Sequence, residues 1–115
     1  YMDATELILL YDYYGDLLTE RQKECFELRY NQDLSLGEIG SELGISRQGV
    51  FDNLSRTEAL LINMEKKTGC VQRDISYRKA MRTISHIAKN LSEHSDANVA
   101  ENANEIMTII QGLEE

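Results

Sequence analysis

The sequence predicts an all-α fold, a bundle of five to six helices. The 115 residues include no proline, and apolar residues recur every three or four positions, as on amphipathic helices, rather than alternating as in strands. Leu, Glu, Lys, Arg, Ile and Ala, which favour helices, are frequent. A chain of this length with 42% hydrophobic residues can form one modest core, so we expect a single domain over residues 1–115.

The first two helices are predicted from apolar spacing and end signals. Residues 4–14 carry the first apolar stripe, and Gly15 is a natural stopping point. Thr19 followed by Gln22 is a capping-box pattern, in which the hydroxyl and the amide satisfy N–H groups at the start of a helix. We therefore expect the second helix over residues 20–30.

A second capping box opens the third helix. Ser35 and Glu38 have the same spacing as the first box. The polar residues 31–33 before them break the preceding helix. The third helix is expected to end near Leu43, because Gly44 can take the left-handed conformation that a tight turn requires.

The fourth helix is predicted to be long. Ser46 has the side chain of an N-cap, and an apolar side continues beyond it along the helix. That side consists of Val50, Leu54, Thr57, Leu61 and Met64. The helix is expected to end at Thr68–Gly69, where glycine again permits a left-handed turn.

Two more helices are expected as a C-terminal helical extension over residues 71–113. The first covers about residues 72–91, the polar residues 92–96 form a linker, and an amphipathic helix follows. The apolar faces are Ile75, Ala80, Met81, Ile84, Ile87, Ala88 and Leu91 in the first helix, and Val99, Ala103, Ile106, Ile109, Ile110 and Leu113 in the second. Because stripes of this length on peripheral helices often need a neighbour, one expectation is a homodimer through these helices.

Residues 34–61 have the pattern of a helix-turn-helix. Two apolar sets would pack the two helices together: Leu36, Ile39 and Leu43 before the turn, and Ile45, Val50 and Leu54 after it. Gly44 supplies the bend, and Gly40 stands where a small residue lets the helices approach closely. We place the helix-turn-helix core at residues 18–65.

The second helix of such a motif carries the residues that read nucleic acid. The candidate set is Ser46, Arg47, Gln48, Asn53 and Arg56. Arg can bond guanine, and Gln or Asn can pair with adenine, each good bidentate contact giving roughly 1–3 kcal/mol of base discrimination. Ser46 and the N–H groups of the helix start could hold a phosphate. Asp52 is unfavourable near phosphates, although it could accept from cytosine or pair with Arg56 four residues on.

Charge is distributed unevenly along the chain, whose formal net charge is −8. Residues 1–43 carry a net charge of −7 and residues 91–115 one of −6, whereas residues 44–90 have nine basic and four acidic residues, a net charge of +5. The basic middle suits nucleic acid, but only Arg47 and Arg56 lie on the expected recognition face, fewer cations than a phosphate-binding surface usually has. Ordinary solvated helix faces would also explain these charges.

Several classes of function lack support in the sequence. No apolar stretch approaches the ~20 residues of a membrane span, and no signal peptide is evident, so we expect a cytoplasmic protein. Cys25 and Cys70 have neither the density nor the spacing of a disulfide framework or a metal knuckle. His86 and His94 are too far apart in helical phase to share a ligand. We therefore expect no enzyme, no cofactor and no metal.

Four segments carry a family resemblance: Leu18-Thr19-Glu20-Arg21-Gln22, Glu27-Leu28-Arg29-Tyr30, Ser35-Leu36-Gly37-Glu38-Ile39 and, most specifically, residues 46–58. Over roughly residues 5–65 the chain resembles the YlxM-like helix-turn-helix proteins of Gram-positive bacteria, which are small, helical and similar in this motif to the fourth region of sigma factors. Gly37, Gly40 and Gly49 stand where that pattern has alanine-like residues, which is expected to loosen both helices of the motif.

The resemblance implies a gene neighbourhood shared with the signal recognition particle and a regulatory role in that protein-targeting pathway. Its functional residues carry over only to Ser46, Arg47, Gln48, Asn53 and Arg56. The leading hypothesis is a nucleic-acid-binding regulatory protein whose partner is DNA or the signal recognition particle RNA. The alternative is a protein-interaction module of the targeting machinery, with a targeting GTPase as partner and the helix-turn-helix used only as a scaffold.

Overall fold

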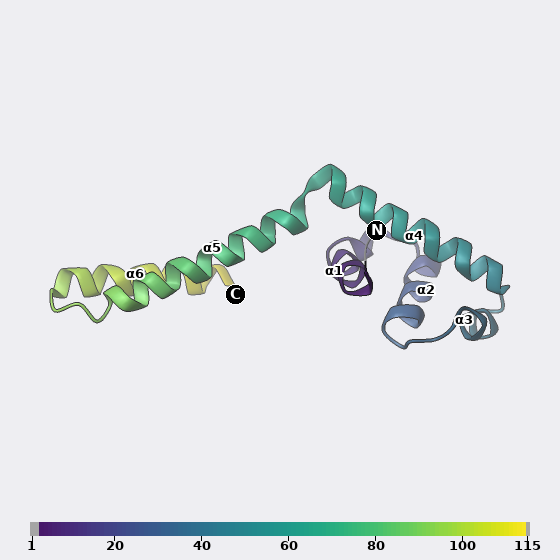
Figure 1. Cartoon of the computed structure of the whole chain (residues 1–115), viewed down its shortest axis with the longest axis horizontal. Helices are drawn as coiled ribbons and strands as arrows, with labels where there is room; N and C mark the ends of the chain where they lie inside the picture. Colours follow the sequence, from purple (N-terminus) through teal and green to yellow (C-terminus); the bar gives the residue numbers. More distant parts are fainter. Residues whose placement is uncertain (1–2, 115) are drawn as a thin grey trace. The chain divides into compact units, whose positions relative to one another are not determined.

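The computed structural model describes residues 3–114. Within that range the chain forms six α-helices and no strand. The helices are α1 (Ala4–Tyr14), α2 (Glu20–Tyr30), α3 (Leu36–Leu43), α4 (Arg47–Thr68), α5 (Cys70–Leu91) and α6 (Ala97–Glu114) (Figure 1). A short 3₁₀ turn, Gly15–Leu17, follows α1. The predicted all-α fold is confirmed, and none of the described helices is long and apolar enough to cross a membrane.

Both predicted capping boxes are present. Thr19 Oγ1 accepts from the Gln22 N–H at 3.2 Å, and the Thr19 N–H donates to Gln22 Oε1 at 2.9 Å. Ser35 and Glu38 form the same reciprocal pair at 3.1 and 3.0 Å. The bond from the Ser35 N–H favours the ionised carboxylate and lowers the pKa of Glu38. Helices α2 and α3 therefore begin where the sequence indicates.

The ends of α3 and α4 lie at glycines in the left-handed conformation, Gly44 with φ 71° and Gly69 with φ 63°. The next helix begins at Cys70, two residues before the predicted start at residue 72. Two side chains explain the earlier start: Thr68 Oγ1 accepts from the Cys70 N–H at 3.3 Å, and Glu65 Oε1 accepts from the Val71 N–H at 3.0 Å. These acceptors satisfy N–H groups that the first turn of a helix leaves without intrahelical partners.

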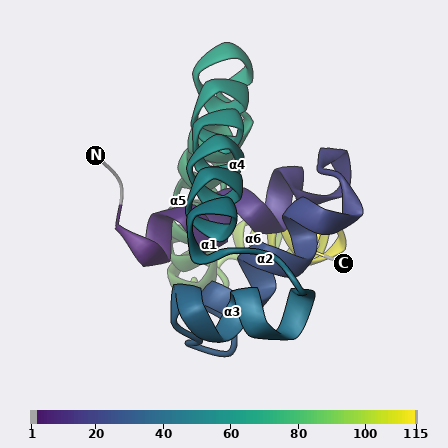
Figure 2. The ribbon, with the colours of Figure 1, turned by 90° about the vertical axis from the view of Figure 1, so that its right-hand side faces the viewer.

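The chain comprises two compact units, residues 1–71 and residues 72–115. In the first unit, α1, α2 and α3 lie along one side of the long helix α4, which packs against all three (Figures 1 and 2). In the second unit, α5 continues to Leu91, and α6 returns beside it in an antiparallel hairpin (Figure 1). The expectation of a single domain over residues 1–115 stays a prediction.

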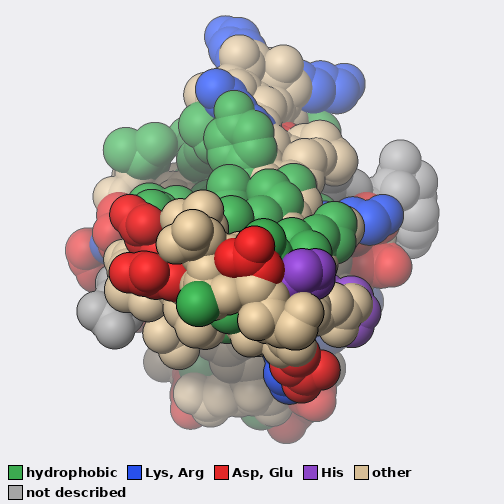
Figure 3. All heavy atoms as spheres, turned by 90° about the vertical axis from the view of Figure 1, so that its left-hand side faces the viewer, with side chains coloured by type: hydrophobic (Ala, Val, Ile, Leu, Met, Phe, Trp, Pro, Cys, Tyr) green, Lys and Arg blue, Asp and Glu red, His purple; other side chains and the backbone are tan. Residues whose placement is uncertain are grey.

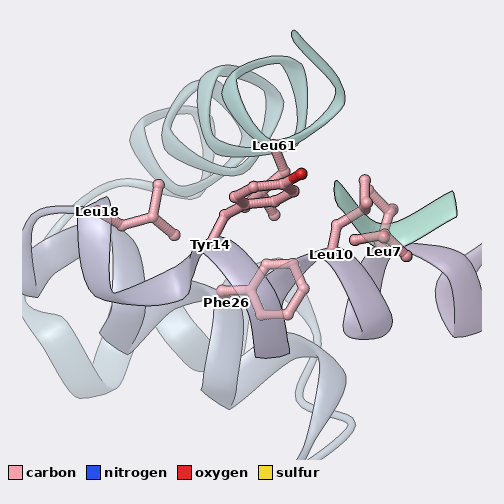
Figure 4. Packing of buried hydrophobic residues seen from close by; sticks show 7 residues of the cluster. Leu7, Leu10, Tyr14, Leu18, Phe26 and Leu61 are labelled. Carbon is pink, nitrogen blue, oxygen red and sulfur yellow. The ribbon is translucent and has the colours of Figure 1, made fainter. Parts of the chain in front are cut away.

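The first unit has two buried clusters. One joins α1 and α2 to α4, and Figure 4 shows Leu61 of α4 directed toward the Tyr14 ring, with Phe26 of α2 close by. Its buried members are Leu7, Leu10, Tyr14, Leu18, Phe26, Leu61 and Val71. The other cluster, Cys25, Ile39, Val50 and Leu54, joins α2 and α3 to the N-terminal half of α4. This second cluster fixes the helix-turn-helix against the rest of the unit.

The hairpin unit buries less than its sequence suggests. Ala88, Ala103 and Ile110 are buried between α5 and α6. Most large residues of the predicted apolar faces are exposed, however: Ile75, Ile84, Ile87 and Leu91 on α5, and Ile106, Ile109 and Leu113 on α6. The predicted apolar faces are therefore only partly covered within the hairpin, because two helices in contact can cover only the narrow strip along which they meet.

Candidate nucleic-acid interface

The turn between α3 and α4 is closed so tightly that only glycine fits at position 40. Gly40 is buried, and a Cβ atom there would lie 2.7 Å from the Ile45 carbonyl oxygen and 3.5 Å from the Arg47 nitrogen. The Ile45 N–H in turn donates to the Gly40 carbonyl at 3.0 Å. The expectation that glycine loosens the motif is therefore wrong for Gly40, since its missing side chain is what allows the two helices to approach.

The other two glycines of the motif differ from Gly40. A Cβ atom at Gly37 would find only Ser35 Oγ, at 4.0 Å, so this position has room for a side chain. A Cβ atom at Gly49 would lie 3.1 Å from Ser46 Oγ, which is tighter than ordinary contact. Gly49 thus leaves space for the cap of its own helix.

The first turn of α4 is exposed and presents Ser46, Arg47 and Gln48 together. Ser46 is the N-cap, because its Oγ accepts from the Gly49 N–H at 2.9 Å. By helix geometry, the N–H groups of Arg47 and Gln48 precede the first intrahelical bond and point out of the helix end. An anion at this end would meet these N–H groups and the positive end of the helix dipole.

Gln48 is held by a neighbour on the same helix. Its Nε2 donates to Asp52 Oδ1 at 3.0 Å. The sequence suggested Arg56 as the partner of Asp52, but the carboxylate is bonded to the residue four positions before it. One N–H and the carbonyl oxygen of the Gln48 amide remain to face outward, and these are the groups with which glutamine pairs with adenine.

Asn53 is the least exposed of the five predicted site residues. It is half-buried, and its Oδ1 atom is buried without a hydrogen-bond partner among the described residues. The structure therefore does not group it with Ser46, Arg47 and Gln48.

The two arginines of the predicted site lie on opposite flanks of α4. Arg47 and Arg56 are both exposed, but nine positions separate them, which corresponds to roughly half a turn around the helix. Arg56 borders a shallow groove that runs toward the start of α2. The groove is lined by Gln22, Arg56, Ala59, Leu60 and Asn63.

Two residues near the site were not singled out in the sequence. Phe51, on the exposed face of α4, is 51% exposed, although phenylalanine is usually buried. Arg21 of α2 is exposed, and its guanidinium donates to the Leu43 carbonyl at 3.3 Å, beside the turn. The mismatch between the phase of Phe51 and the apolar side of α4 was a usable signal. No local pattern could connect Arg21 with a residue 22 positions away.

The cysteines and histidines considered as reactive or metal-binding residues in the sequence lie either in the core or on the surface. Cys25 is fully buried, and this burial raises the pKa of its thiol, whereas Cys70 is exposed. His86 and His94 are both exposed, and His94 Nδ1 accepts from the Asp96 N–H at 3.0 Å in the linker. Cys25 therefore serves as a small apolar core residue.

Comparisons with known proteins point to the same motif. The family model described as "Putative helix-turn-helix protein, YlxM / p13 like" (UPF0122) matches residues 2–106. A UPF0122 protein of Thermoanaerobacter sp. (strain X514) is 46% identical over 89 residues, which cover 77% of this chain and 74% of the relative. One from Acetivibrio thermocellus is 54% identical over 68 residues, covering 59% and 58%. One from Bacillus mycoides (strain KBAB4) is 36% identical over 111 residues, covering 96% and 94%.

The family match extends far beyond the residues that carried the resemblance. It continues from the helix-turn-helix through α5 and into α6, so the hairpin is part of the shared sequence and not an addition to it. The family description names a helix-turn-helix, which agrees with the turn geometry at Gly40 and Gly44. This chain belongs to the YlxM/p13-like helix-turn-helix family, UPF0122.

Proposed function

We propose that the protein is a regulatory protein that binds double-stranded DNA through the N-terminal half of α4. The observation that carries the proposal is the exposed first turn of α4, which presents Ser46, Arg47 and Gln48 beyond a turn that only Gly40 permits. In a helix-turn-helix, this part of the second helix enters the major groove. No catalytic step is part of the proposal.

The residues of α4 are suited to separate tasks. Gln48, oriented by Asp52, is the base-reading residue, with Phe51 beside it for the methyl group of thymine. Arg47 and Arg56, on opposite flanks of the helix, are placed for phosphates on the two strands that border the groove. Asn53 contributes less than the sequence suggested, because its Oδ1 atom is buried.

The geometry favours DNA over the signal recognition particle RNA. The major groove of B-form DNA is wide enough for a helix, whereas that of A-form RNA is deep and narrow. We place the activity in the cytoplasm, in regulation of the signal recognition particle pathway. This placement is supported by the family resemblance, and the DNA preference is supported by the helix geometry.

Binding to random-sequence duplex DNA and duplex RNA, measured by fluorescence anisotropy over a range of salt concentrations, tests the proposal. Arg47→Ala and Arg56→Ala are each expected to weaken DNA binding and to reduce the steepness of log K against log salt by about one, because each removes a phosphate contact. Gln48→Ala is expected to preserve this salt dependence and to lose roughly 1–3 kcal/mol of discrimination at one base of a selected site.

Lys67→Ala is the matched control. It also removes one exposed positive charge from α4, but at the C-terminal end of the helix, so binding should change little. If the wild-type protein bound no nucleic acid at low salt, where such binding is strongest, the proposal would be wrong. Tighter binding to duplex RNA than to DNA would overturn the choice of DNA.

A second candidate function has its own observation. Leu60 is 41% exposed on α4 and lines the shallow groove with Arg56 and Gln22. An exposed leucine in a groove rimmed by polar residues is typical of a protein contact. In this alternative the chain is a protein-interaction module of the targeting machinery, and a targeting GTPase binds at the groove.

The two functions make different predictions for the same variants. After nuclease treatment, a pull-down with the purified targeting GTPase should retain the wild-type protein and lose Leu60→Asp if the groove is the contact. DNA binding that persists in Leu60→Asp, without any GTPase retained by the wild type, would favour the first function.

A further inference from the structure

The hairpin of α5 and α6 exposes more large apolar side chains than it buries. Tyr77 is 61% exposed, Ile87 53%, Ile109 59% and Leu113 69%. Figure 3 looks onto the hairpin from the side of its 92–96 linker and shows several hydrophobic side chains lying next to one another on the surface. A contiguous apolar surface of this kind on a protein surface usually marks an interaction site.

The exposed residues follow the spacing of a coiled coil. They recur at alternating intervals of three and four residues, which is the heptad pattern of helices that pack along a seam. On α5 the stripe is Tyr77, Ala80, Ile84, Ile87 and Leu91. On α6 it is the half-buried Val99 followed by the exposed Asn102, Ile106, Ile109 and Leu113. We refer to these as the outer stripes of the hairpin.

Both outer stripes lie on the same face of the hairpin. On α5 the stripe is offset by roughly a sixth of a turn from the buried Ala88, and on α6 it is offset in the same rotational sense from the buried Ala103 and Ile110. Because the two helices run antiparallel, equal offsets place both stripes on one side. The face is therefore a two-helix surface with apolar residues along both of its helices.

We propose that this face binds the same face of a second copy of the chain, forming a four-helix bundle. This inference goes beyond DNA binding and does not depend on it. A two-helix layer with heptad stripes on both helices is half of such a bundle, and a twofold axis makes the same surface serve both partners.

The charges of the two helices select the arrangement. Five basic residues and one acidic residue give α5 a net charge of +4, and three glutamates give α6 a net charge of −3. A twofold axis parallel to the helices places α5 of one copy against α6 of the other, so opposite charges are adjacent. An axis perpendicular to the helices would place α5 against α5, where like charges repel.

The spacing of the stripes supports the same arrangement. An axis parallel to the helices preserves height along the hairpin, so positions at equal distance from the 92–96 linker meet across the interface. The five layers are Leu91 with Val99, Ile87 with Asn102, Ile84 with Ile106, Ala80 with Ile109, and Tyr77 with Leu113. Asn102 is the polar residue among apolar ones in its stripe, and one such residue in a seam is a common means of fixing register.

The mass of the nuclease-treated, full-length protein in solution, measured by multi-angle light scattering, tests the proposal. The wild-type protein is expected to have twice the mass of one chain. Ile84→Lys, in the middle of the α5 stripe, is expected to have the mass of one chain, with its helical circular dichroism retained because the position is exposed. Ile75→Lys is the matched control: Ile75 and Ile84 are each 42% exposed on α5, but Ile75 lies on the opposite side of the helix from the stripe.

Cysteine cross-linking distinguishes the two arrangements. In a Cys70→Ser background, a refolded equimolar mixture of the single variants Ala80→Cys and Ile109→Cys should form a covalent dimer on mild oxidation, because these positions meet between copies and no chain carries both thiols. Ile84→Cys alone should not, since Ile84 meets Ile106 and not its own equivalent. A cross-link formed by Ile84→Cys alone would overturn the α5-to-α6 arrangement.

Two results would overturn the proposal itself. A wild-type protein that stays monomeric at high concentration would show that a second copy does not cover this face. A dimer that persists equally in Ile84→Lys and Ile75→Lys would show that the copies meet elsewhere. Neither result bears on DNA binding by α4, which the anisotropy measurements test separately.

Discussion

Two tyrosines of α1 place their rings in the core and their hydroxyls at its edge. Tyr14 is 6% exposed, and its hydroxyl donates to Glu65 Oε1 at 2.6 Å. The Tyr11 ring stacks on Phe26 at a centroid distance of 4.4 Å, and its hydroxyl donates to Glu27 Oε1 at 3.0 Å. Burial, and secondarily the hydrogen bond to a carboxylate, raises the pKa of Tyr11 to about 12 and also raises that of Tyr14.

The raised tyrosine pKa values predict a loss of stability at high pH. The folded state holds these protons more tightly than the unfolded chain, in which the pKa is 10.0. The stabilisation is therefore complete below pH 10 and is lost as the pH rises toward the folded pKa of Tyr11, about 12. Urea unfolding between pH 8 and 12 should show a decline that is smaller in Tyr11→Phe and smaller still in the Tyr11→Phe, Tyr14→Phe double variant.

The phenylalanine variants should also be less stable than the wild type at neutral pH, and this loss checks that the tyrosine hydrogen bonds contribute to stability. At neutral pH each should lose about 0.5–1.5 kcal/mol, the usual contribution of one hydrogen bond. If the decline above pH 10 were as steep in the double variant as in the wild type, the tyrosines would not be responsible for it.

At the scale of the helices, the junction of α3 and α4 predicts opposite effects for two similar substitutions. Gly40→Ala should destabilise the protein by about 1–3 kcal/mol, because the new Cβ would overlap the Ile45 carbonyl, a backbone atom that cannot move aside cheaply. Gly37→Ala, with open space around it, should stabilise α3 by about 0.5–1 kcal/mol. Urea unfolding of the two variants checks both signs, and a Gly40→Ala protein as stable as Gly37→Ala would refute the tight turn.

Helix boundaries were predictable because their signals are local. Thr19 with Gln22, and Ser35 with Glu38, form the capping boxes that their spacing implies, and Gly44 takes the left-handed conformation that ends α3. These features depend on backbone chemistry within a few residues. The start of α5 was missed because its acceptors, on Glu65 and Thr68, belong to the preceding helix and reach across a turn.

Partners on the surface of α4 were less predictable than its ends. Asp52 lies four residues from both Gln48 and Arg56, so the spacing allows it to pair with either. The sequence alone does not tell which pair is more stable. In the structure Asp52 pairs with Gln48. Asn53 looked like a surface residue by type, but its half-buried flank depends on how α4 packs against its neighbours. The site could be located from the sequence, while the direction of each side chain could not.

At the scale of the whole molecule, we predict that residues 1–115 unfold as a single domain in the monomeric Ile84→Lys variant, in which the hairpin has no second copy to pack against. Three residues, Ala88, Ala103 and Ile110, are buried within the described part of the hairpin unit, and so small a core rarely supports independent folding. In Tyr77→Phe the remaining tyrosines all lie in residues 1–71, so tyrosine fluorescence reports the first unit and far-UV circular dichroism reports all helices. The two signals should give one coincident transition; two separate transitions would indicate two domains.

What covers the apolar surface of the hairpin could not be predicted from the sequence. The periodicity of α5 and α6 correctly indicated helices, but a repeating apolar pattern does not tell whether it faces the same chain, a second copy or solvent. On α5 the pattern contains two stripes, one toward α6 that includes Met81 and Ala88, and one facing outward that includes Ile84 and Ile87. Only the folded hairpin separates them.

The two cysteines give this protein a chemical reporter of its own motions. Cys25 is enclosed by Ile39, Val50 and Leu54, where α2, α3 and α4 meet, whereas Cys70 is exposed. A thiol reagent added to the folded protein therefore reacts with Cys70 directly and reaches Cys25 only when the helix-turn-helix opens. The rate of the Cys25 reaction measures how often the helix-turn-helix opens under native conditions. The rate of the Cys70 reaction gives the reactivity of the reagent with an exposed thiol, against which the Cys25 rate is compared. A ligand that binds α4 and stabilises the closed motif would slow the reaction of Cys25 and leave that of Cys70 unchanged.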